Sequence, residues 1–258
     1  MKRILIPLLA ALALCACHNE SSLKTKVFED DFALPLGESR PDSLWVKTSV
    51  EYPVDGASDA VLKTLREQLC DVLFGGLETS DDIEARAIQY REEVVAEYLD
   101  EFLLSAPDTS DHRIMTWTRE KTGRFLPDWK DYYCYEEELN EYWGGNHGTA
   151  GYITFVFSKA DGSWVEEFEF FKDGYEDPVR ELICKHLQAD VIPQFEKDGF
   201  DPEPLNLIIE EGGGWPNGVY VPGKDGVTWT YQPYEIAPYA YGIIRVTVPW
   251  DELSEYVR

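Results

Sequence analysis

The chain has 258 residues, of which 23 are lysine or arginine and 49 are aspartate or glutamate, giving a formal net charge of −26. Because binding to nucleic acid depends on basic residues that displace counterions from phosphates, this charge argues against a nucleic-acid partner. Hydrophobic residues make up 44% of the chain and aromatic residues 14%. That apolar content is high enough to bury a core, which excludes an intrinsically disordered protein.

Residues 1–16 have the pattern of a bacterial lipoprotein signal peptide. The positive pair Lys2-Arg3 precedes an apolar run over 4–16, whose 13 residues are too few to span the roughly 30 Å hydrocarbon core of a membrane. The run ends in Leu14-Cys15-Ala16-Cys17, which resembles a lipobox with Cys17 as the lipidated residue. We therefore expect cleavage before Cys17 and several acyl chains that hold the protein on the membrane. The alternative is an ordinary cleaved signal and a soluble periplasmic protein.

The expected location is the bacterial cell envelope, on the outer membrane, the cell surface or the periplasmic side. Loss of residues 1–16 removes two positive charges and no negative charge, so the net charge of the mature chain becomes −28. Three unmodified cysteines then remain, Cys70, Cys134 and Cys184, and their number and spacing exclude a dense disulfide framework. Cys70 and Cys184 fall in helical apolar patterns, where buried inert thiols are expected, although one disulfide among the three stays open.

The first half of the chain is expected to combine a tether, a strand and two helices. Residues 17–42 are mostly polar and contain chain-breaking residues, which predicts a tether that lifts a domain off the bilayer. A strand is expected over 44–52 and a helix over 57–73, where apolar residues recur at helical spacing. A second helix is expected to begin after a cap at Asp81. Its apolar stripe consists of Ile83, Ala87, Tyr90, Val94, Tyr98 and Phe102.

Strands dominate the second half. They are expected over 115–118, 131–143, 152–157, 163–170, 205–209, 219–221, 227–231 and 243–248. Asp161-Gly162 is expected to turn a hairpin between 152–157 and 163–170. One helix begins at Asp177-Pro178 and is expected to end before Pro193. This segregation predicts an α+β fold of mixed or antiparallel sheets packed with helices, in two closely associated subdomains, 43–148 and 149–258.

The sequence contains no motif of a familiar enzyme class. The four histidines do not form HExxH, G-x-S-x-G is absent, and the glycine-rich stretch 212–216 lacks the lysine and hydroxyl residue that would hold phosphates. With 49 acidic residues, a pair of carboxylates is no evidence for a glycosidase. Glu136-Glu137-Glu138 is expected to be a solvated strand end. We expect a monomer that is not an enzyme and holds no metal or cofactor.

Two segments are candidate binding elements. In the first, Tyr142–Gly148, glycines on both sides of His147 allow positive φ angles and leave the imidazole in a sharp turn. The second, Tyr231–Gly242, is rich in tyrosine and proline and leads into the strand at 243–248. The candidate binding residues are Trp143, His147, Tyr234, Glu235, Tyr239 and Tyr241. The alternative is structural: a histidine bonded to nearby backbone and tyrosines packed between strands.

These segments resemble a known family. The stretch 224–253, which contains Tyr231–Gly242, is similar to the C-terminal extracytoplasmic domain of RsiV-type anti-sigma factors. Gly144-Gly145-Asn146-His147-Gly148 resembles the family's Gly-Gly-Ala-His-Gly turn, with asparagine in place of alanine. The resemblance covers residues 127–258 well and residues 43–126 in outline. The same domain is appended to some cell-wall polysaccharide deacetylases and occurs in lipoproteins of unknown function.

The resemblance implies a receptor, because RsiV-type domains bind lysozyme. We expect this chain to lack the sigma-binding segment and transmembrane helix of that family, and the His-x-x-x-His metal motif of the deacetylases is absent. The first hypothesis is therefore a membrane-anchored, non-catalytic domain that binds a cationic protein such as lysozyme, which the acidic charge would attract. The alternative is a module that binds or processes cell-wall glycan, either peptidoglycan or polysaccharide, with some of the eight tryptophans as stacking surfaces.

Overall fold

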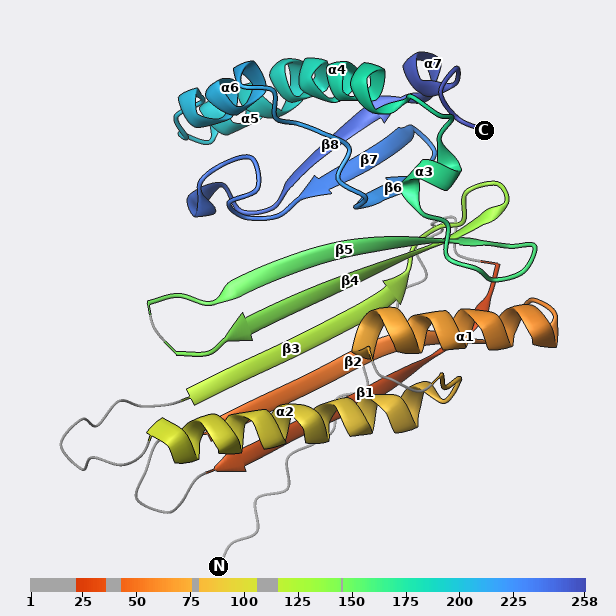
Figure 1. Cartoon of the computed structure of the whole chain (residues 1–258), viewed down its shortest axis with the longest axis vertical. Coiled ribbons are helices and arrows are strands. Elements are labelled where there is room, and N and C mark those ends of the chain that lie inside the picture. Colours follow the sequence, from red (N-terminus) through yellow and green to blue (C-terminus); the bar gives the residue numbers. More distant parts are fainter. Residues whose placement is uncertain (1–21, 36–42, 76–78, 106–115, 145) are drawn as a thin grey trace, which may run out of the picture.

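The computed structural model describes residues 22–35, 43–75, 79–105, 116–144 and 146–258. These residues form a five-stranded sheet and a three-stranded sheet, each packed with helices (Figure 1). The expected α+β fold class is confirmed. The expected signal peptide and Cys17 lie outside the described residues. Within the described ranges, no helix is long and apolar enough to cross a membrane.

The larger sheet contains the first five strands in chain order. They are β1 (Lys24–Pro35), β2 (Ser43–Asp55), β3 (Thr116–Phe125), β4 (Tyr132–Tyr142) and β5 (Thr149–Ser158). β2 and β3 are parallel, whereas the other neighbouring strands are antiparallel. A parallel pair needs a long crossover connection. The helices α1 (Asp59–Phe74) and α2 (Ile83–Ser105) provide it and cover one face of the sheet (Figure 1).

Both helices bury the residues expected from their apolar pattern. The buried side chains are Val61, Leu62, Leu65, Leu69 and Leu73 on α1, and Ile83, Ala87, Val94 and Tyr98 on α2. Tyr90 is half-buried, and the side chain of Phe102 lies outside the described part of the chain. The expected cap of α2 is wrong by one residue. The N–H of Ala85 donates to Asp82 Oδ1 at 3.0 Å, whereas Asp81 forms an ion pair with Arg66 at 3.1 Å.

The expected tether over 17–42 is wrong for Lys24–Pro35, which form β1. This strand pairs antiparallel with β2 along its whole length. The pattern is hard to detect in the sequence because β1 is an edge strand, where charged residues alternate with the half-buried Phe28 and Phe32. Lys24–Pro35 therefore belong to the folded domain.

β5 completes the larger sheet, so the expected subdomain division after residue 148 lies between two hydrogen-bonded strands, β4 and β5. The sheet continues to Ser158. The expected hairpin between 152–157 and 163–170 is confirmed only next to its turn, where Phe157 forms an antiparallel bridge with Trp164 and the Val165 N–H donates to the Val156 carbonyl at 2.7 Å. The rest of the expected second strand is wrong, because Glu167–Phe170 form the short helix α3. The Glu169 side chain accepts the Glu166 N–H at 2.9 Å at the start of α3, an arrangement that stabilises a helix N-terminus.

The smaller sheet and its helices form a second layer. Its helices are α4 (Glu176–His186), α5 (Ile192–Lys197), α6 (Glu203–Glu210) and α7 (Trp250–Leu253), and its antiparallel strands are β6 (Tyr220–Pro222), β7 (Gly226–Tyr231) and β8 (Ile244–Pro249). The strands expected at 219–221, 227–231 and 243–248 are confirmed. β8 alternates as expected, because Ile244, Val246 and Val248 are buried whereas Arg245 and Thr247 are exposed.

Two expectations in the second layer are wrong. Pro193 does not end the helical segment, because Leu187–Val191 form a π-helical turn that joins α4 to α5. Pro193 then lies in the first turn of α5, where its missing N–H is tolerated. The apolar run 205–209 belongs to α6 instead of a strand, with Leu205 and Ile209 buried. Such a short run suits either element by its pattern alone.

The acidic run at 136–138 is not a solvated strand end. Glu136 and Glu137 are buried within β4, and they face opposite sides of the sheet because neighbouring strand residues alternate. Glu137 forms an ion pair with the buried Lys121. Glu136 accepts hydrogen bonds from Arg124 and Tyr152. Both carboxylates are therefore paired inside the fold instead of solvated.

β5 lies at the junction of the two layers. Thr154 Oγ1 donates to the carbonyl of Tyr220 at 2.9 Å. The Gln232 side chain accepts the Tyr152 N–H at 2.8 Å and donates back to the Tyr152 carbonyl at 2.5 Å. These bonds hold the segment after β7 beside the strand pair β4–β5.

Candidate functional site

Three of the six candidate residues form one exposed aromatic cluster, defined by His147, Tyr234 and Tyr239. The ring centroids of His147 and Tyr239 are 4.4 Å apart, with 27° between the ring planes. The centroids of Tyr234 and Tyr239 are 5.5 Å apart. His147 is exposed, and 67% of the Tyr234 surface is accessible to solvent. The structure therefore brings together residues from two segments that are 87 positions apart between His147 and Tyr234.

Gly148 holds the two segments of the aromatic cluster together. Its carbonyl accepts the Tyr239 hydroxyl at 2.9 Å and lies 2.9 Å from His147 Nδ1. A Cβ atom at Gly148 would lie 2.6 Å from the carbonyl oxygen of Glu141, so a larger residue would not fit the turn. Gly144, on the other side of the histidine, has a φ of 87°. The glycines that make this turn conspicuous in the sequence also determine its shape.

Tyr234 is held in an uncommon backbone conformation. Its φ of 71° lies in the left-handed region, which a bulky residue rarely adopts. The Tyr234 N–H donates to the Ala237 carbonyl at 3.1 Å. The neighbouring Glu235 carboxylate accepts the Gln232 N–H at 2.7 Å and the Asn217 side-chain amide at 2.8 Å. Glu235 therefore stabilises the loop that presents Tyr234 and is a positioning residue.

The candidates Trp143 and Tyr241 lie outside the aromatic cluster. Trp143 packs on Trp117, with centroids 4.6 Å apart, and the Arg119 guanidinium lies 4.6 Å from the Trp143 centroid. Tyr241 packs on Phe195 and Phe200, and its hydroxyl donates to the Asp201 carbonyl. Tyr241 therefore has the packing role that was the alternative for the aromatic candidates, whereas Trp143 packs on Trp117 and keeps 36% of its surface exposed.

The described residues offer little reactive chemistry. Among them, no group of three or more His, Cys, Asp or Glu side chains is arranged to hold a metal ion. Cys70, Cys134 and Cys184 are free thiols, and all three are buried. Burial raises the pKa of Cys70 and of Cys134 to about 12, so neither forms the reactive thiolate near neutral pH. The helical placement expected for Cys70 and Cys184 is confirmed.

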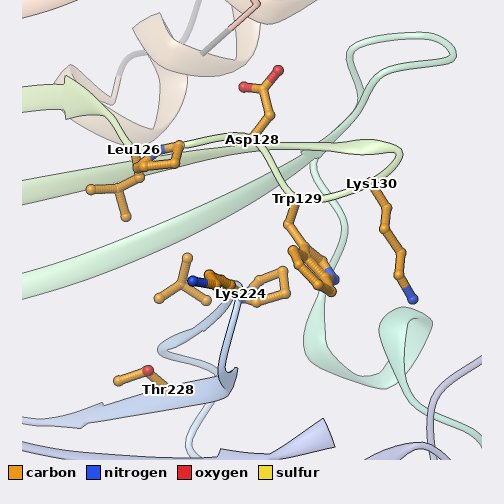
Figure 2. A pocket seen from close by; sticks show the side chains of 10 residues that line it. Leu126, Asp128, Trp129, Lys130, Lys224 and Thr228 are labelled. Carbon is orange, nitrogen blue, oxygen red and sulfur yellow. The ribbon is translucent and has the colours of Figure 1, made fainter. Parts of the chain in front are cut away.

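A pocket of about 570 Å³ lies between the β3–β4 turn and the β6–β7 pair (Figure 2). Its lining includes Leu126, Pro127, Trp129, Lys130, Pro222 and Lys224. Trp129 points from the turn toward β6 and β7, whereas Asp128 points to the other side of the turn (Figure 2). No sequence pattern indicates this pocket, because its two walls come from segments about ninety positions apart and neither contains a recognisable motif.

The fold and the aromatic cluster define the class of protein. It is an α+β domain of two sheets, each packed with helices, that presents aromatic side chains at one end. Residues 169–251 match the family model described as "Protein of unknown function (DUF3298)". The match begins in α3, ends in α7 and includes both tyrosines of the aromatic cluster. No curated protein is similar enough to the chain to count as a relative.

Two solved structures of DUF3298 proteins share this fold. A family member from Bacteroides fragilis NCTC 9343 is 19% identical, with a TM-score of 0.76 over 93% of this chain and 96% of that one. A DUF3298 protein from Pseudomonas aeruginosa PAO1 is 16% identical, with a TM-score of 0.59 over 93% of this chain and 97% of that one. At these identities the likeness establishes the fold, and the family description assigns no activity.

Proposed function

We propose that the protein is a monomeric, lipid-anchored lipoprotein of the bacterial envelope that binds a cationic protein such as lysozyme and does not catalyse a reaction. The observation that carries the proposal is the aromatic cluster, in which three rings are in contact and two of them are exposed. Tyrosine is enriched among the residues that dominate the energy of protein interfaces. The resemblance to RsiV-type receptors supports lysozyme as the partner.

Fixed geometry makes the aromatic cluster a better binding surface than three mobile side chains would be. The Tyr239 hydroxyl is bonded to Gly148, and the Tyr234 loop is held by Glu235. Because these side chains are ordered before a partner arrives, less conformational entropy is lost on binding. The net charge of −26 adds a long-range attraction for a basic protein, which raises the association rate at low salt.

A glycan-binding or glycan-processing module receives less support. Exposed tryptophans suited to stacking on sugars are Trp45, Trp143, Trp164 and Trp215, which are 36% to 51% exposed. They lie on different parts of the fold, and in the described structure none makes a ring contact with another of the four. No two of these four tryptophans therefore stack on each other in the described structure.

A titration with a c-type lysozyme at low ionic strength tests the proposed function. We expect binding that weakens as salt is added, because screening removes the charge attraction. Replacing a tyrosine at the centre of an interface typically costs about 2 kcal/mol or more, so Tyr234→Ala should weaken binding about 30-fold. The measurement is the dissociation constant by isothermal titration calorimetry.

Phe168→Ala is the matched control, because Phe168 is also exposed, at 57%, but lies on α3 away from the aromatic cluster. Its dissociation constant should equal that of the unchanged protein. Absence of lysozyme binding at low ionic strength would contradict this partner. Equal losses in Tyr234→Ala and Phe168→Ala would contradict the proposed binding surface.

A further inference from the structure

The end of the molecule at the β3–β4 turn carries two stacked tryptophans and two exposed lysines. The rings of Trp129 and Trp250 are 5.1 Å apart with 7° between their planes. Lys130 Nζ lies 5.4 Å from the Trp129 centroid and 5.5 Å from the Trp250 centroid. Lys224 lines the pocket beside Trp129 (Figure 2). We call these four residues the tryptophan–lysine face.

The charge of this face differs from that of the whole molecule. In the described structure, neither Lys130 nor Lys224 forms an ion pair with a carboxylate. Asp131 and Asp225 follow the two lysines in the chain and Asp251 follows Trp250, so the two lysines partly offset the neighbouring carboxylates within a protein of charge −26. Both lysines therefore remain available to an external anion.

The N-terminal part of the chain joins the domain at the same turn. The backbone N–H and the hydroxyl of Ser22 both donate to Asp128 Oδ2, at 2.9 Å and 2.7 Å. Lys159 Nζ lies 2.8 Å from the same carboxylate oxygen. Five residue steps separate Ser22 from Cys17, and a fully extended chain of that length spans at most about 17 Å. A lipid on Cys17 therefore keeps this turn within about 17 Å of the membrane.

Tryptophan and lysine are the side chains best suited to a membrane surface. Tryptophan concentrates at the level of the lipid headgroups, where one part of the ring is apolar and its N–H stays hydrated. Lysine extends its charge toward lipid phosphates, and one lysine near an anionic membrane contributes about fivefold to binding. The apolar wall of the pocket, formed by Leu126, Pro127 and Pro222, lies beside Trp129.

We infer that the tryptophan–lysine face docks on the phospholipid surface, with Trp129 and Trp250 at headgroup level and Lys130 and Lys224 against lipid phosphates. This inference rests on the lipid anchor at Cys17 in the proposed function. Docking fixes the orientation of the anchored protein. β4 has 11 residues and runs from this end toward the aromatic cluster, which places the cluster about 34 Å from the membrane side.

The test uses the full mature lipoprotein in vesicles of phosphatidylglycerol and phosphatidylcholine whose acyl chains are brominated, because bromine quenches nearby tryptophan fluorescence. We expect quenching that falls by about half or more in Trp129→Phe, which removes one reporter and keeps an aromatic ring. In the double variant Lys130→Gln with Lys224→Gln, the docked population relative to the undocked one should fall about 25-fold. Far-ultraviolet circular dichroism establishes that each variant is folded.

The matched control is Lys47→Gln with Lys197→Gln, which removes the same charge from β2 and α5 and should leave quenching unchanged. Equal quenching in the two double variants would overturn the docking, as would equal quenching in Trp129→Phe and the unchanged protein. Partition into detergent is measured first, with Cys17→Ala as the reference. If the unchanged protein partitions no better than Cys17→Ala, the lipid anchor itself fails. If it partitions but the variants are quenched alike, docking alone fails.

Discussion

Glu167 is a buried carboxylate that joins α3 to the smaller sheet. It accepts the Trp229 indole N–H and the Gly218 N–H, the latter at 3.0 Å. Burial raises the pKa of Glu167 above its ordinary value of 4.5, although both hydrogen bonds oppose that change. The folded state therefore holds the proton more tightly than the unfolded state does, and the stability that this adds at low pH is lost as pH rises through the native pKa.

A Glu167→Gln variant tests this pH dependence. The free energy of unfolding of the unchanged protein contains a contribution that falls from pH 4.5 up to the raised native pKa, with a slope of at most about 1.4 kcal/mol per pH unit. The variant lacks that contribution. Its stability relative to the unchanged protein should therefore improve as pH rises above 4.5, measured by urea unfolding. A stability difference between the two proteins that is constant with pH, or that changes in the opposite direction, would contradict the raised pKa of Glu167.

The three thiols should be inert in the folded protein. Cys134 is 0%, Cys70 3% and Cys184 9% exposed, and burial raises the pKa of each. With a thiol reagent at pH 8, we expect no fast labelling of the native chain and labelling of all three residues after denaturation. Cys184 should react first on partial unfolding because it is the most exposed. Fast native labelling of Cys134 would show that its surroundings open in solution.

At the scale of elements, periodicity predicts the fold wherever one face is clearly apolar. This holds for α1, α2 and β8, whose buried positions follow the expected spacing. Periodicity does not predict β1, because β1 is an edge strand whose exposed face and free edge both tolerate charged residues. Short length makes 205–209 ambiguous between strand and helix. The sequence contains no signal for the π-helical turn that accommodates Pro193.

The candidate site is predictable in part for similar reasons. The glycines around His147 and the tyrosine-rich segment are local signals, and they indicate two halves of the aromatic cluster. Trp143 and Tyr241 lie in the same segments, but their orientation depends on the packing partners Trp117 and Phe195, which belong to distant elements. The sequence alone does not distinguish the aromatic residues of the cluster from Trp143 and Tyr241, which pack on neighbouring rings.

The buried pair Lys121–Glu137 gives a prediction for the larger sheet. The Lys121 side chain is 6% and the Glu137 side chain 5% exposed, and Lys121 also donates to the Leu73 carbonyl at the end of α1. Glu137→Gln leaves a buried lysine without a countercharge, which should lower the free energy of unfolding by about 3–5 kcal/mol. Replacing both residues, by Lys121→Met with Glu137→Leu, should recover most of that loss.

The exposed pair Lys24–Asp55 is the control for this prediction, with side chains 75% and 60% exposed. Lys24→Gln should change the free energy of unfolding by less than about 1 kcal/mol, because surface ion pairs contribute little. Chemical denaturation measures all three variants. A loss in Glu137→Gln no larger than that in Lys24→Gln would show that water reaches the buried pair.

At the scale of the whole molecule, the long strands of the larger sheet separate two ends with different chemistry. The β4–β5 turn carries His147 of the aromatic cluster, whereas the β3–β4 turn carries Trp129 and receives the N-terminal chain at Asp128 (Figure 1). The lipid anchor that we propose at one end would leave the other end accessible to a partner. In the proposed function, the net charge of −26 would attract a basic protein to the accessible end.

The most direct test of the proposed receptor is hydrogen–deuterium exchange with and without a c-type lysozyme at low ionic strength. We predict slower amide exchange in 146–148 and 232–241, which contain the aromatic cluster, and unchanged exchange in 127–130 and 222–225, which contain Trp129 and Lys224. Protection at the second pair of segments, or bound lysozyme with no protection at the first pair, would contradict this account of the binding surface.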